Sequence, residues 1–308
     1  MVVSQQEFEK NREDLADFDA YVFHRPLFSE RLVDFVYGLD RDIAFADFDD
    51  LIFDHRLAGD TPMVRVRKSP IADVETYVQR TAAAAAIFRN FSVSTLPLKE
   101  SVERAFGPAS VGVVHNCPDP GFVALGTVAR HTRPHDEREF ELGYFSGTAT
   151  HDLDFASIGD VVLDFLQESG HRLLLVGPLV LPPRFDRIAD RIERLPLMPF
   201  HRLPDVMARC RRVLAPLEDS PFTRAKSGIK FFEAVLTGCD VLATPIPDVD
   251  RFSSPLLRKC RTADEWRAAL DEPPVLAPHE REQEICLLQE KFSIDRQLAP
   301  FFDFLQRG

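Results

Sequence analysis

Short apolar runs alternate with longer stretches of helical periodicity along the first half of the chain. Residues 29–39 show this periodicity most clearly, because their apolar side chains recur at positions i, i+3, i+4 and i+7. Strands are predicted at 20–24, at the start of 42–54, at 91–95 and at 110–115, and helices over 29–39, 71–90 and 98–106. This alternation predicts a parallel sheet with helices on both faces.

The pattern lapses between residues 116 and 139, where proline, charged and turn-forming residues replace the apolar runs. A domain boundary is therefore predicted there, with one lobe over 1–138 and a second over 139–308. The terminal helix of the second lobe is a candidate to cross back to the first lobe. Beyond the boundary, strands are predicted at 141–147, 171–177, 192–196, 211–217 and 239–245, and helices over 154–168, 203–210, 226–237, 263–271 and 279–292. The pattern predicts an α/β fold with two Rossmann-like lobes, of which the first is short or truncated.

Composition is typical of a soluble globular protein. The chain has 308 residues, 45% of them hydrophobic and 28% charged, which is enough for two domains. No apolar run approaches the roughly 18 residues of a membrane span, and the polar, acidic residues 1–14 do not form a secretory signal, so a cytoplasmic location is predicted. A net charge of −12 without a basic segment argues against nucleic acid as a partner. The cysteines are widely spaced and form no CxxC pair, so neither a disulfide framework nor a zinc site is expected.

The first candidate site lies in residues 141–155, ELGYFSGTATHDLDF, where an apolar strand leads through Ser146, Gly147 and Thr148 into a helix. Backbone N–H groups at the start of a helix favour a phosphate, and glycine permits a close approach to the ligand. His151 follows this loop and is the histidine best placed to reach that ligand. The structural alternative stays open, because a glycine at such a turn and a lone histidine both commonly serve the fold alone.

The second candidate site lies in residues 220–238, after a predicted buried strand whose carboxyl end opens on the crevice where α/β sheets bind ligands. Arg224, Lys226 and Lys230 supply cations for a diphosphate, and the two lysines are predicted to share one helix face because they lie four residues apart. Glu233 offers a carboxylate for ribose hydroxyls. The alternative is a helix-surface ion pair between Lys230 and Glu233, worth about 0.3 kcal/mol.

Several segments occur in an order that resembles the donor-binding lobe of family 4 retaining glycosyltransferases, which have the two-lobed GT-B architecture. These segments are GYFSGTATHDLDF, LLLVG, RIERLPLMPFHRLPDVMARC, RRVLAPLED and RAKSGIKFFEAVLTGCDVLATPI. The last resembles a bacterial polysaccharide subgroup with a KSxxKxxE core, here Lys226, Ser227, Lys230 and Glu233. DFDDLIFD and VSTLPLKESV resemble the acceptor lobe of the same subgroup, so the resemblance covers most of residues 20–305.

The resemblance implies that Arg224 and Lys226 act on the donor diphosphate, that Glu233 binds the ribose and that the Gly147 loop lies nearby. It also implies a retaining transfer without a metal or other cofactor, in which the cations stabilise the leaving diphosphate. The chain departs from the family at Ala225, eight residues before Glu233, where the broader family often has a second acidic residue.

An acidic cluster in ADFDDLIFDHR contains Asp47, Asp49 and Asp50. Clustered carboxylates can bind a hard cation, place a general base at an acceptor hydroxyl, or form a solvated loop in which Asp50 caps backbone N–H groups. An acceptor-side or structural role is favoured over a metal site, and Asp49 is the predicted catalytic residue on the acceptor side.

The leading hypothesis is transfer of a hexose or deoxyhexose from a nucleoside diphosphate sugar to a glycan or lipid-linked acceptor. Closure of the two lobes over the donor would exclude water from the reaction. Two alternatives stay open: a nucleotide-sugar epimerase of the same architecture, and a non-catalytic scaffold for glycan assembly. A peripheral contact of the first lobe with the inner face of the membrane is a further expectation.

Overall fold

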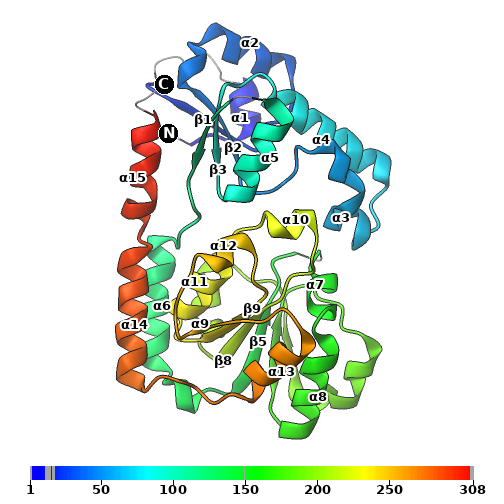
Figure 1. Cartoon of the computed structure of the whole chain (residues 1–308), viewed down its shortest axis with the longest axis vertical. Helices are drawn as coiled ribbons and strands as arrows, with labels where there is room; N and C mark the ends of the chain where they lie inside the picture. Colours follow the sequence, from blue (N-terminus) through cyan, green and yellow to red (C-terminus); the bar gives the residue numbers. More distant parts are fainter. Residues whose placement is uncertain (1, 11–14, 16–17, 108, 149, 306–308) are drawn as a thin grey trace.

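The computed structural model describes residues 2–10, 15, 18–107, 109–148 and 150–305, and these form two α/β lobes, one above the other in Figure 1. Each lobe is built on a parallel sheet with helices packed against it. In the described chain the first sheet has four strands and the second has six. The predicted fold class, two Rossmann-like lobes with a short first lobe, is confirmed.

The strands of the first sheet follow their order in the sequence, β1-β2-β3-β4, and all pairs are parallel. They are β1 (Tyr21–His24), β2 (Ala44–Phe48), β3 (Asn90–Val93) and β4 (Ser110–Val113). The helices and turns of this lobe are α1 (Gln5–Lys10), α2 (Glu30–Gly38), η2 (Arg41–Ile43), η3 (His55–Asp60), α3 (Pro62–Arg65), α4 (Ile71–Ala85) and α5 (Leu96–Phe106). Because each crossover leads to the next strand in the same direction, the strand order of this sheet never reverses among the described strands.

The central strands of the first sheet are buried, which explains their apolar sequences. Phe45 and Phe48 of β2 and Phe91 of β3 are at most 1% exposed, as expected for parallel strands covered on both faces. The covering helices begin at sequence signals, because Ser29 and Thr95 accept backbone N–H bonds through their hydroxyl oxygens and cap α2 and α5. The sequence pattern and the local structure agree throughout this sheet.

The second sheet has the order β10-β9-β8-β5-β6-β7, again with all pairs parallel. Its strands are β5 (Phe140–Phe145), β6 (Leu173–Val176), β7 (Ile192–Leu195), β8 (Cys210–Ala215), β9 (Asp240–Ala243) and β10 (Leu257–Lys259). Its helices and turns are η4 (His135–Glu137), α7 (Asp152–Ala156), α8 (Gly159–Ser169), η5 (Pro183–Arg191), η6 (Phe200–Arg202), α9 (Leu203–Met207), α10 (Pro221–Arg224), α11 (Ile229–Leu236), α12 (Pro247–Asp250) and α13 (Ala263–Asp271). The strand order reverses between β5 and β8, which is where open α/β sheets bind their ligands.

Three helices connect the lobes along one side of the molecule (Figure 1). They are α6 (Pro120–Thr132), α14 (Pro278–Lys291) and α15 (Ile294–Leu305). On α6, Arg130 Nη1 donates to the carbonyl oxygen of Leu236 at 3.1 Å, so this helix packs on the second lobe. On α15, the Phe304 ring lies 5.4 Å from that of Phe45, measured between ring centroids, so the last helix packs on the first sheet. The chain thus crosses between the lobes twice.

The lobes also contact each other where α10 and α12 reach towards the first sheet (Figure 1). Thr95 Oγ1 donates to the carbonyl oxygen of Ala225 at 2.9 Å, and Arg65 Nη1 lies 2.5 Å from Glu218 Oε1. Ala225 is 2% exposed and packs in the core of the first lobe. The segment 216–228 therefore bridges the lobes, and position 225 belongs to this interlobe contact.

Among the stretches that differ from the predicted elements, two concern the helices around the start of the second lobe. Helix α6 lies inside the interval where the apolar pattern lapses, because Asp119 caps its start and Pro120 fills its first turn, both of which also resemble a loop in sequence. The predicted helix over 154–168 is two helices, α7 and α8, which are separated after Ala156. The first error is a whole helix that the sequence did not predict, and the second is a break inside a predicted helix.

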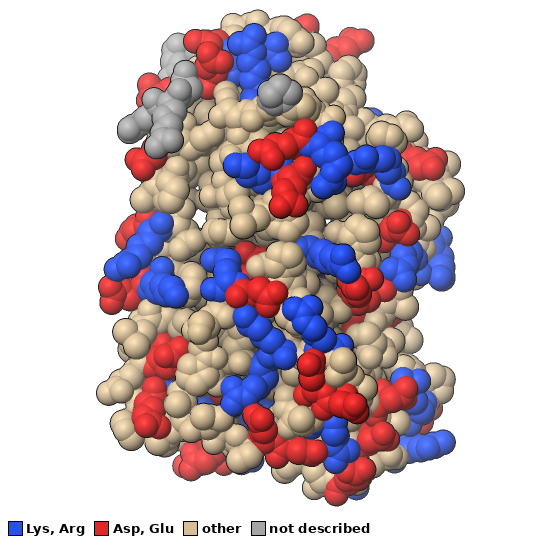
Figure 2. Space-filling model, viewed as in Figure 1, with Lys and Arg blue, Asp and Glu red and all other residues tan. Residues whose placement is uncertain are grey.

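Acidic and basic side chains are interspersed on the face shown in Figure 2. Because opposite charges alternate over short distances there, the local pocket and not the overall charge determines which ligand binds. Within the described ranges, each helix is too short or too polar to cross a bilayer.

Candidate functional site

A pocket of about 340 Å³ opens at the carboxyl ends of β5, β6, β8 and β9, where the strand order of the second sheet reverses. Its walls are the loop after β5, the segment after β8 and the first turns of α11. The predicted site residues that line it are Ser146, Gly147, His151, Lys226, Lys230 and Glu233. Its volume is typical of a small-molecule site. This cavity is named the switch pocket because it lies at the point where the strand order of the sheet reverses. It is the candidate functional site.

The loop after β5 forms one wall and is held firmly at its base. Ser146 N donates to the carbonyl oxygen of Val176 at 2.8 Å, and Ser146 Oγ donates to that of Thr148 at 2.6 Å. Gly177 has a φ of +96°, and a Cβ at this position would lie 1.8 Å from the carbonyl oxygen of Ser146, so glycine is required. At Gly147, an added Cβ would meet no atom of the described residues within 4 Å, so the backbone there is open to a ligand.

His151 is fixed by a carboxylate that the sequence pattern did not single out. Its Nδ1 lies 2.8 Å from Asp154 Oδ2, and Glu218 N donates to Asp154 Oδ1 at 3.0 Å. With Nδ1 engaged by the buried Asp154, Nε2 is the ring nitrogen that can contact a ligand. Burial lowers the pKa of His151, so the ring is neutral near neutral pH. The available signal was the spacing of three residues between His151 and Asp154 at the start of a helix.

The two lysines enter the pocket from different elements, which corrects the prediction that they share one helix face. Helix α11 begins at Ile229, so Lys230 lies in its first turn and Lys226 precedes it. The chain is kept out of the helix at Gly228, whose N–H donates to Asp248 Oδ2 at 2.7 Å. The prediction was wrong because spacing alone does not show where a helix starts.

Lys230 and Glu233 both lie in the pocket wall. Lys230 Nζ donates to the carbonyl oxygen of Phe145 at 3.0 Å and lies 5.4 Å from the centroid of the Tyr144 ring. Burial lowers the pKa of Lys230 and raises that of Glu233, while the attraction between the two charges opposes both shifts. The two side chains thus face the pocket and not the outer surface of the helix.

Ser227 supplies a hydroxyl that is buried in the pocket wall beside Lys226. Its Oγ has no hydrogen-bond partner among the described residues. A buried polar group without a partner is unfavourable, so an atom of a ligand that accepts a hydrogen bond there would be stabilising. Lys226 Nζ lies 5.5 Å from the centroid of the Phe222 ring, so a cation–π interaction stabilises the ammonium.

Three predicted site residues lie outside the switch pocket. Arg224 is on α10 with 62% of its side chain exposed, and its Nε pairs with Asp219 Oδ1 at 2.7 Å. Thr148 lies on the exposed part of the loop after β5. Asp49 belongs to the first lobe, where its Oδ1 is 2.5 Å from Arg25 Nε. The structure therefore gathers six of the predicted residues in one pocket and places these three around it.

The acidic cluster of the first lobe lies at the carboxyl end of β2, and its carboxylates pair with basic side chains at the carboxyl end of β1. Arg25 Nη2 is 2.9 Å from Asp50 Oδ2, in addition to its contact with Asp49. His24 Nδ1 is 2.7 Å from Asp47 Oδ2. In the described ranges, no group of three or more His, Cys, Asp or Glu side chains is arranged to hold a metal ion.

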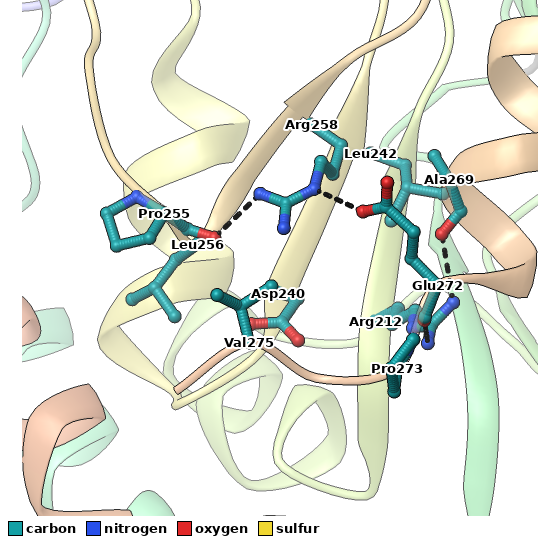
Figure 3. Close-up of a pocket in the computed structure, with 10 residues that line it drawn as sticks. All are labelled: Arg212, Asp240, Leu242, Pro255, Leu256, Arg258, Ala269, Glu272, Pro273 and Val275. Carbon is teal, nitrogen blue, oxygen red and sulfur yellow. Dashed lines mark hydrogen bonds and ion pairs between the residues drawn. The ribbon is translucent and has the colours of Figure 1, made fainter. Parts of the chain in front are cut away.

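A much smaller cavity of about 20 Å³ lies at the opposite end of the second sheet (Figure 3). It has room for about one water molecule. Arg212 Nη1 donates to the carbonyl oxygen of Ala269 at 3.2 Å, and Arg258 Nε donates to Glu272 Oε2 at 2.8 Å. These bonds satisfy the charged groups around the cavity, so the cluster stabilises the base of the sheet.

Comparisons with known proteins were made for both the sequence and the fold. The sequence matches no family model and no curated protein. HepE from Anabaena, crystallised with UDP and glucose, is 14% identical with a TM-score of 0.61, and the alignment covers 97% of this chain and 81% of that one. The UDP-forming α,α-trehalose-phosphate synthase from Burkholderia xenovorans, in complex with glucose-6-phosphate, is 11% identical with a TM-score of 0.61, covering 99% and 80%. WaaG, a glycosyltransferase involved in lipopolysaccharide biosynthesis, is 14% identical with a TM-score of 0.55, covering 99% and 84%.

These similarities concern the fold. Alignments over almost the whole chain, at identities of 11% to 14%, show that both lobes and their connection are shared. The fold is therefore of the GT-B type that the sequence predicted. The assignment to family 4 stays a prediction.

Proposed function

We propose that this protein is a glycosyltransferase that moves a hexose or deoxyhexose from a nucleoside diphosphate sugar to a glycan or lipid-linked acceptor, with retention of configuration and without a metal ion. The observation that carries the proposal is the composition of the switch pocket. Lys226, Lys230, Ser227, His151 and Glu233 converge there at the carboxyl edge of the second sheet. Cations, a donor hydroxyl and a carboxylate are the groups that a nucleoside diphosphate requires.

The roles follow from the chemistry of each group. Lys226 and Lys230 contact the diphosphate, and the unpartnered Ser227 hydroxyl donates to one of its oxygens. Glu233 accepts hydrogen bonds from the ribose hydroxyls, as acidic residues do in dinucleotide-binding folds. His151, with Nδ1 held by Asp154, offers Nε2 to the sugar or the diphosphate.

In this mechanism the lysines stabilise the charge that develops on the departing diphosphate. Their ammonium groups are already in position before the reaction, so little reorganisation is required in the transition state. Burial lowers the pKa of Lys230 in the free protein, and a bound diphosphate favours its charged form. Arg224 lies beside this site, but its pairing with Asp219 would have to break before it reached the donor.

The similar structures support a nucleotide-sugar donor. HepE was crystallised with UDP and glucose, and the trehalose-phosphate synthase is UDP-forming. WaaG is a glycosyltransferase of lipopolysaccharide biosynthesis, which agrees with a glycan or lipid-linked acceptor. The proposal extends these activities to the present chain on the basis of the pocket.

Donor binding is tested by calorimetry and thermal unfolding with UDP-, GDP- and dTDP-sugars. A ligand that binds only the folded state raises its apparent stability. Lys226→Ala should weaken binding of the preferred donor about 10- to 100-fold, since a hydrogen bond to a charged group contributes about 1.5–3 kcal/mol. Lys99→Ala is the matched control, because Lys99 lies in an exposed pair with Glu103 on α5. If none of the UDP-, GDP- and dTDP-sugars bound to the protein, the proposal would be contradicted.

Metal independence and retention of configuration are tested by measuring the transfer reaction. We expect the initial rate to be unchanged by EDTA and the anomeric configuration of the donor to be kept in the product, as observed by NMR. A rate that depends on added Mg²⁺ would refute metal independence, and an inverted product would refute retention.

One observation favours a non-catalytic alternative. Position 225 holds a buried alanine whose carbonyl oxygen is bonded to Thr95 of the first lobe, so no carboxylate reaches the donor from there. A scaffold for glycan assembly would bind the donor and leave it intact in the presence of every acceptor. Release of UDP, GDP or dTDP in proportion to product separates the enzyme from the scaffold.

A further inference from the structure

A second large pocket lies in the first lobe, on the outer side of β1. Its volume is about 640 Å³, and its lining comes from α1, β1 with the residues after it, and α2. The lining is mainly apolar and includes Phe8, Phe18, Tyr21, Val22, Phe23 and Phe35. This size and composition are typical of small-molecule sites, which combine an apolar wall with a few placed polar groups. The cavity is named the β1 pocket.

The apolar wall of the β1 pocket is firmly packed. The Phe8 ring lies 5.1 Å from the Phe35 ring and 5.7 Å from the Phe23 ring, in both cases edge to face. Val22 is 47% exposed and Phe18 is 39% exposed, so part of the wall is accessible to a ligand. An accessible apolar wall on a rigid base favours the burial of a hydrocarbon chain.

The polar mouth of the β1 pocket is formed by His24 and Arg25 at the carboxyl end of β1. His24 is oriented by Asp47, which also accepts a hydrogen bond from Ser92 of β3. Arg25 is oriented by Asp49 and Asp50, as described above. These side chains are therefore fixed, and their remaining hydrogen-bonding positions are available to a ligand at the mouth.

The mouth also faces the donor site. Thr95, which follows β3, donates to the carbonyl oxygen of Ala225 beside Lys226, so the carboxyl edge of the first sheet meets the wall of the switch pocket. Burial raises the pKa of Asp50 at this edge, and the cations Arg25 and Lys226 oppose that rise. Asp50 in turn binds Arg25 at 2.9 Å. The mouth of the β1 pocket therefore lies on the edge of the first sheet that contacts the second lobe.

We infer that the β1 pocket binds the acceptor, and that this acceptor is a neutral glycoside whose apolar chain fills the pocket while its sugar hydroxyls contact His24 and Arg25. The inference rests on the proposed glycosyl transfer and gives its acceptor a chemical class. Asp47, Asp49 and Asp50, which pair with His24 and Arg25, balance the charge of the imidazole and the guanidinium. The mouth thus has no excess positive charge and suits hydroxyl groups better than a phosphate.

The test uses methyl, butyl and hexyl β-D-glucopyranoside as probes with the full chain, in ligand-observed NMR titrations. Each methylene that enters the pocket should tighten binding about fourfold, because the burial of one methylene contributes about 0.8 kcal/mol. Hexyl phosphate should bind more weakly than the hexyl glucoside. Equal affinity for the methyl and hexyl glucosides would refute the claim that the β1 pocket binds the apolar chain. Tighter binding of hexyl phosphate would refute the claim that the head group is neutral.

Val22→Glu is the diagnostic variant, because it places a charge on the accessible wall without filling the core. It should abolish the dependence of affinity on chain length. Val128→Glu is the matched control, since Val128 is 64% exposed on α6, away from the pocket. Chain-length dependence that persists in Val22→Glu, or that is lost equally in Val128→Glu, would overturn the inference.

The two proposals fail separately. UDP-sugar binding is measured in the absence of a glucoside, and Val22→Glu should leave it unchanged. If no nucleotide sugar binds while the glucosides retain their chain-length dependence, the proposed transfer is refuted and the β1 pocket stands as a glycoside-binding site. If the donor binds normally and chain length has no effect, only the acceptor class is refuted.

Discussion

The two lobes share one architecture but use the carboxyl edges of their sheets differently. In the second lobe the strand order reverses between β5 and β8, and the loops that diverge there leave a pocket. In the first lobe the strands follow one another in a single direction, and the basic and acidic side chains at the same edge pair with each other. The comparison shows that topology creates the crevice, because loops separate only where successive crossovers turn to opposite sides.

The difference extends to the state of the polar groups. In the second lobe, Ser227 Oγ is buried without a partner among the described residues, and burial shifts the pKa values of Lys230 and Glu233. In the first lobe, His24 and Arg25 are already oriented by carboxylates. Shifted pKa values occur in both lobes, so the difference lies in the buried hydroxyl that lacks a partner, which a ligand would stabilise by accepting its hydrogen bond. The switch pocket therefore offers an unsatisfied hydroxyl to a ligand, whereas the mouth of the β1 pocket presents side chains that are already paired.

The largest expected effect comes from the base of the switch pocket. Gly177→Ala adds a Cβ at a φ of +96°, directly against the carbonyl oxygen of Ser146, so the loop after β5 must move. Backbone strain together with the clash should lower the free energy of unfolding by about 3–5 kcal/mol. Urea unfolding measures the change, and donor binding should be lost with it.

Gly170→Ala is the matched control for that variant. Gly170 has a φ of +72° at the end of α8, but an added Cβ would meet no described atom within 4 Å. Only the backbone strain remains, which costs about 1 kcal/mol. Equal losses in the two variants would show that close contact with the loop is not what requires glycine at position 177.

A pH effect of intermediate size is expected from a buried histidine of the second lobe. Burial, together with Arg281, lowers the pKa of His135 to about 4. The unfolded chain titrates near 6.5 and binds the proton first, so the contribution of His135 to stability is complete above that pH and is lost as the pH falls towards 4. Between pH 7 and pH 5 the parent should lose about 2 kcal/mol more than His135→Gln, as measured by urea unfolding.

The first lobe should show the opposite sign. The hydrogen bond to Asp47 raises the pKa of His24, so its contribution to stability is complete below the unfolded value of about 6.5 and is lost as the pH rises through the folded value. The His24 side chain is 57% exposed, so solvent screening keeps the effect small. His24→Gln should therefore change the pH profile less than His135→Gln, and a larger change would contradict the contrast between the lobes.

A smaller effect is expected at the contact between the lobes. Thr95→Val removes the hydroxyl that caps α5 and bonds to the carbonyl oxygen of Ala225, which leaves that buried oxygen without this partner. The free energy of unfolding should fall by about 2 kcal/mol. Thr95→Ser keeps the hydroxyl and should lose less than half as much. If valine and serine were equivalent in urea unfolding, the interlobe bond would contribute nothing.

Sequence patterns predicted the fold because strands buried on both faces and amphipathic helices each have a distinct apolar period. Glu233 and the Gly147 loop both line the switch pocket, as the resemblance to family 4 glycosyltransferases implied and as the sequence patterns alone did not. The patterns placed the start of α11 too early, because the bond from Gly228 to Asp248 that delays the helix joins residues twenty positions apart.

Tertiary partners explain what the sequence did not reveal. Asp154 orients His151 from inside the protein, and its exposure cannot be read from the pattern HDLD. Arg224 was predicted beside the diphosphate because of its charge, yet it pairs with Asp219 on the surface. The β1 pocket depends on how α1 packs on β1, which no local period encodes. The sequence patterns therefore did not predict which side chains pair with each other or how a helix packs on the sheet.

The smallest effect on stability is expected at the exposed end of the interlobe contact. Arg65 pairs with Glu218 at 2.5 Å with 37% of its side chain exposed, so Arg65→Ala should lower stability by no more than about 1 kcal/mol, and less at high salt. The effect of Arg65→Ala on lobe closure should be larger, because the backbone N–H of Glu218 donates to Asp154, the residue that orients His151. In small-angle scattering with a bound donor, Arg65→Ala should give a more open particle than the parent protein. Arg267→Ala removes two ion pairs inside the second lobe, with Glu168 and Asp271, and should leave the size of the particle unchanged. Identical scattering by the two variants would mean that the lobes close without this ion pair.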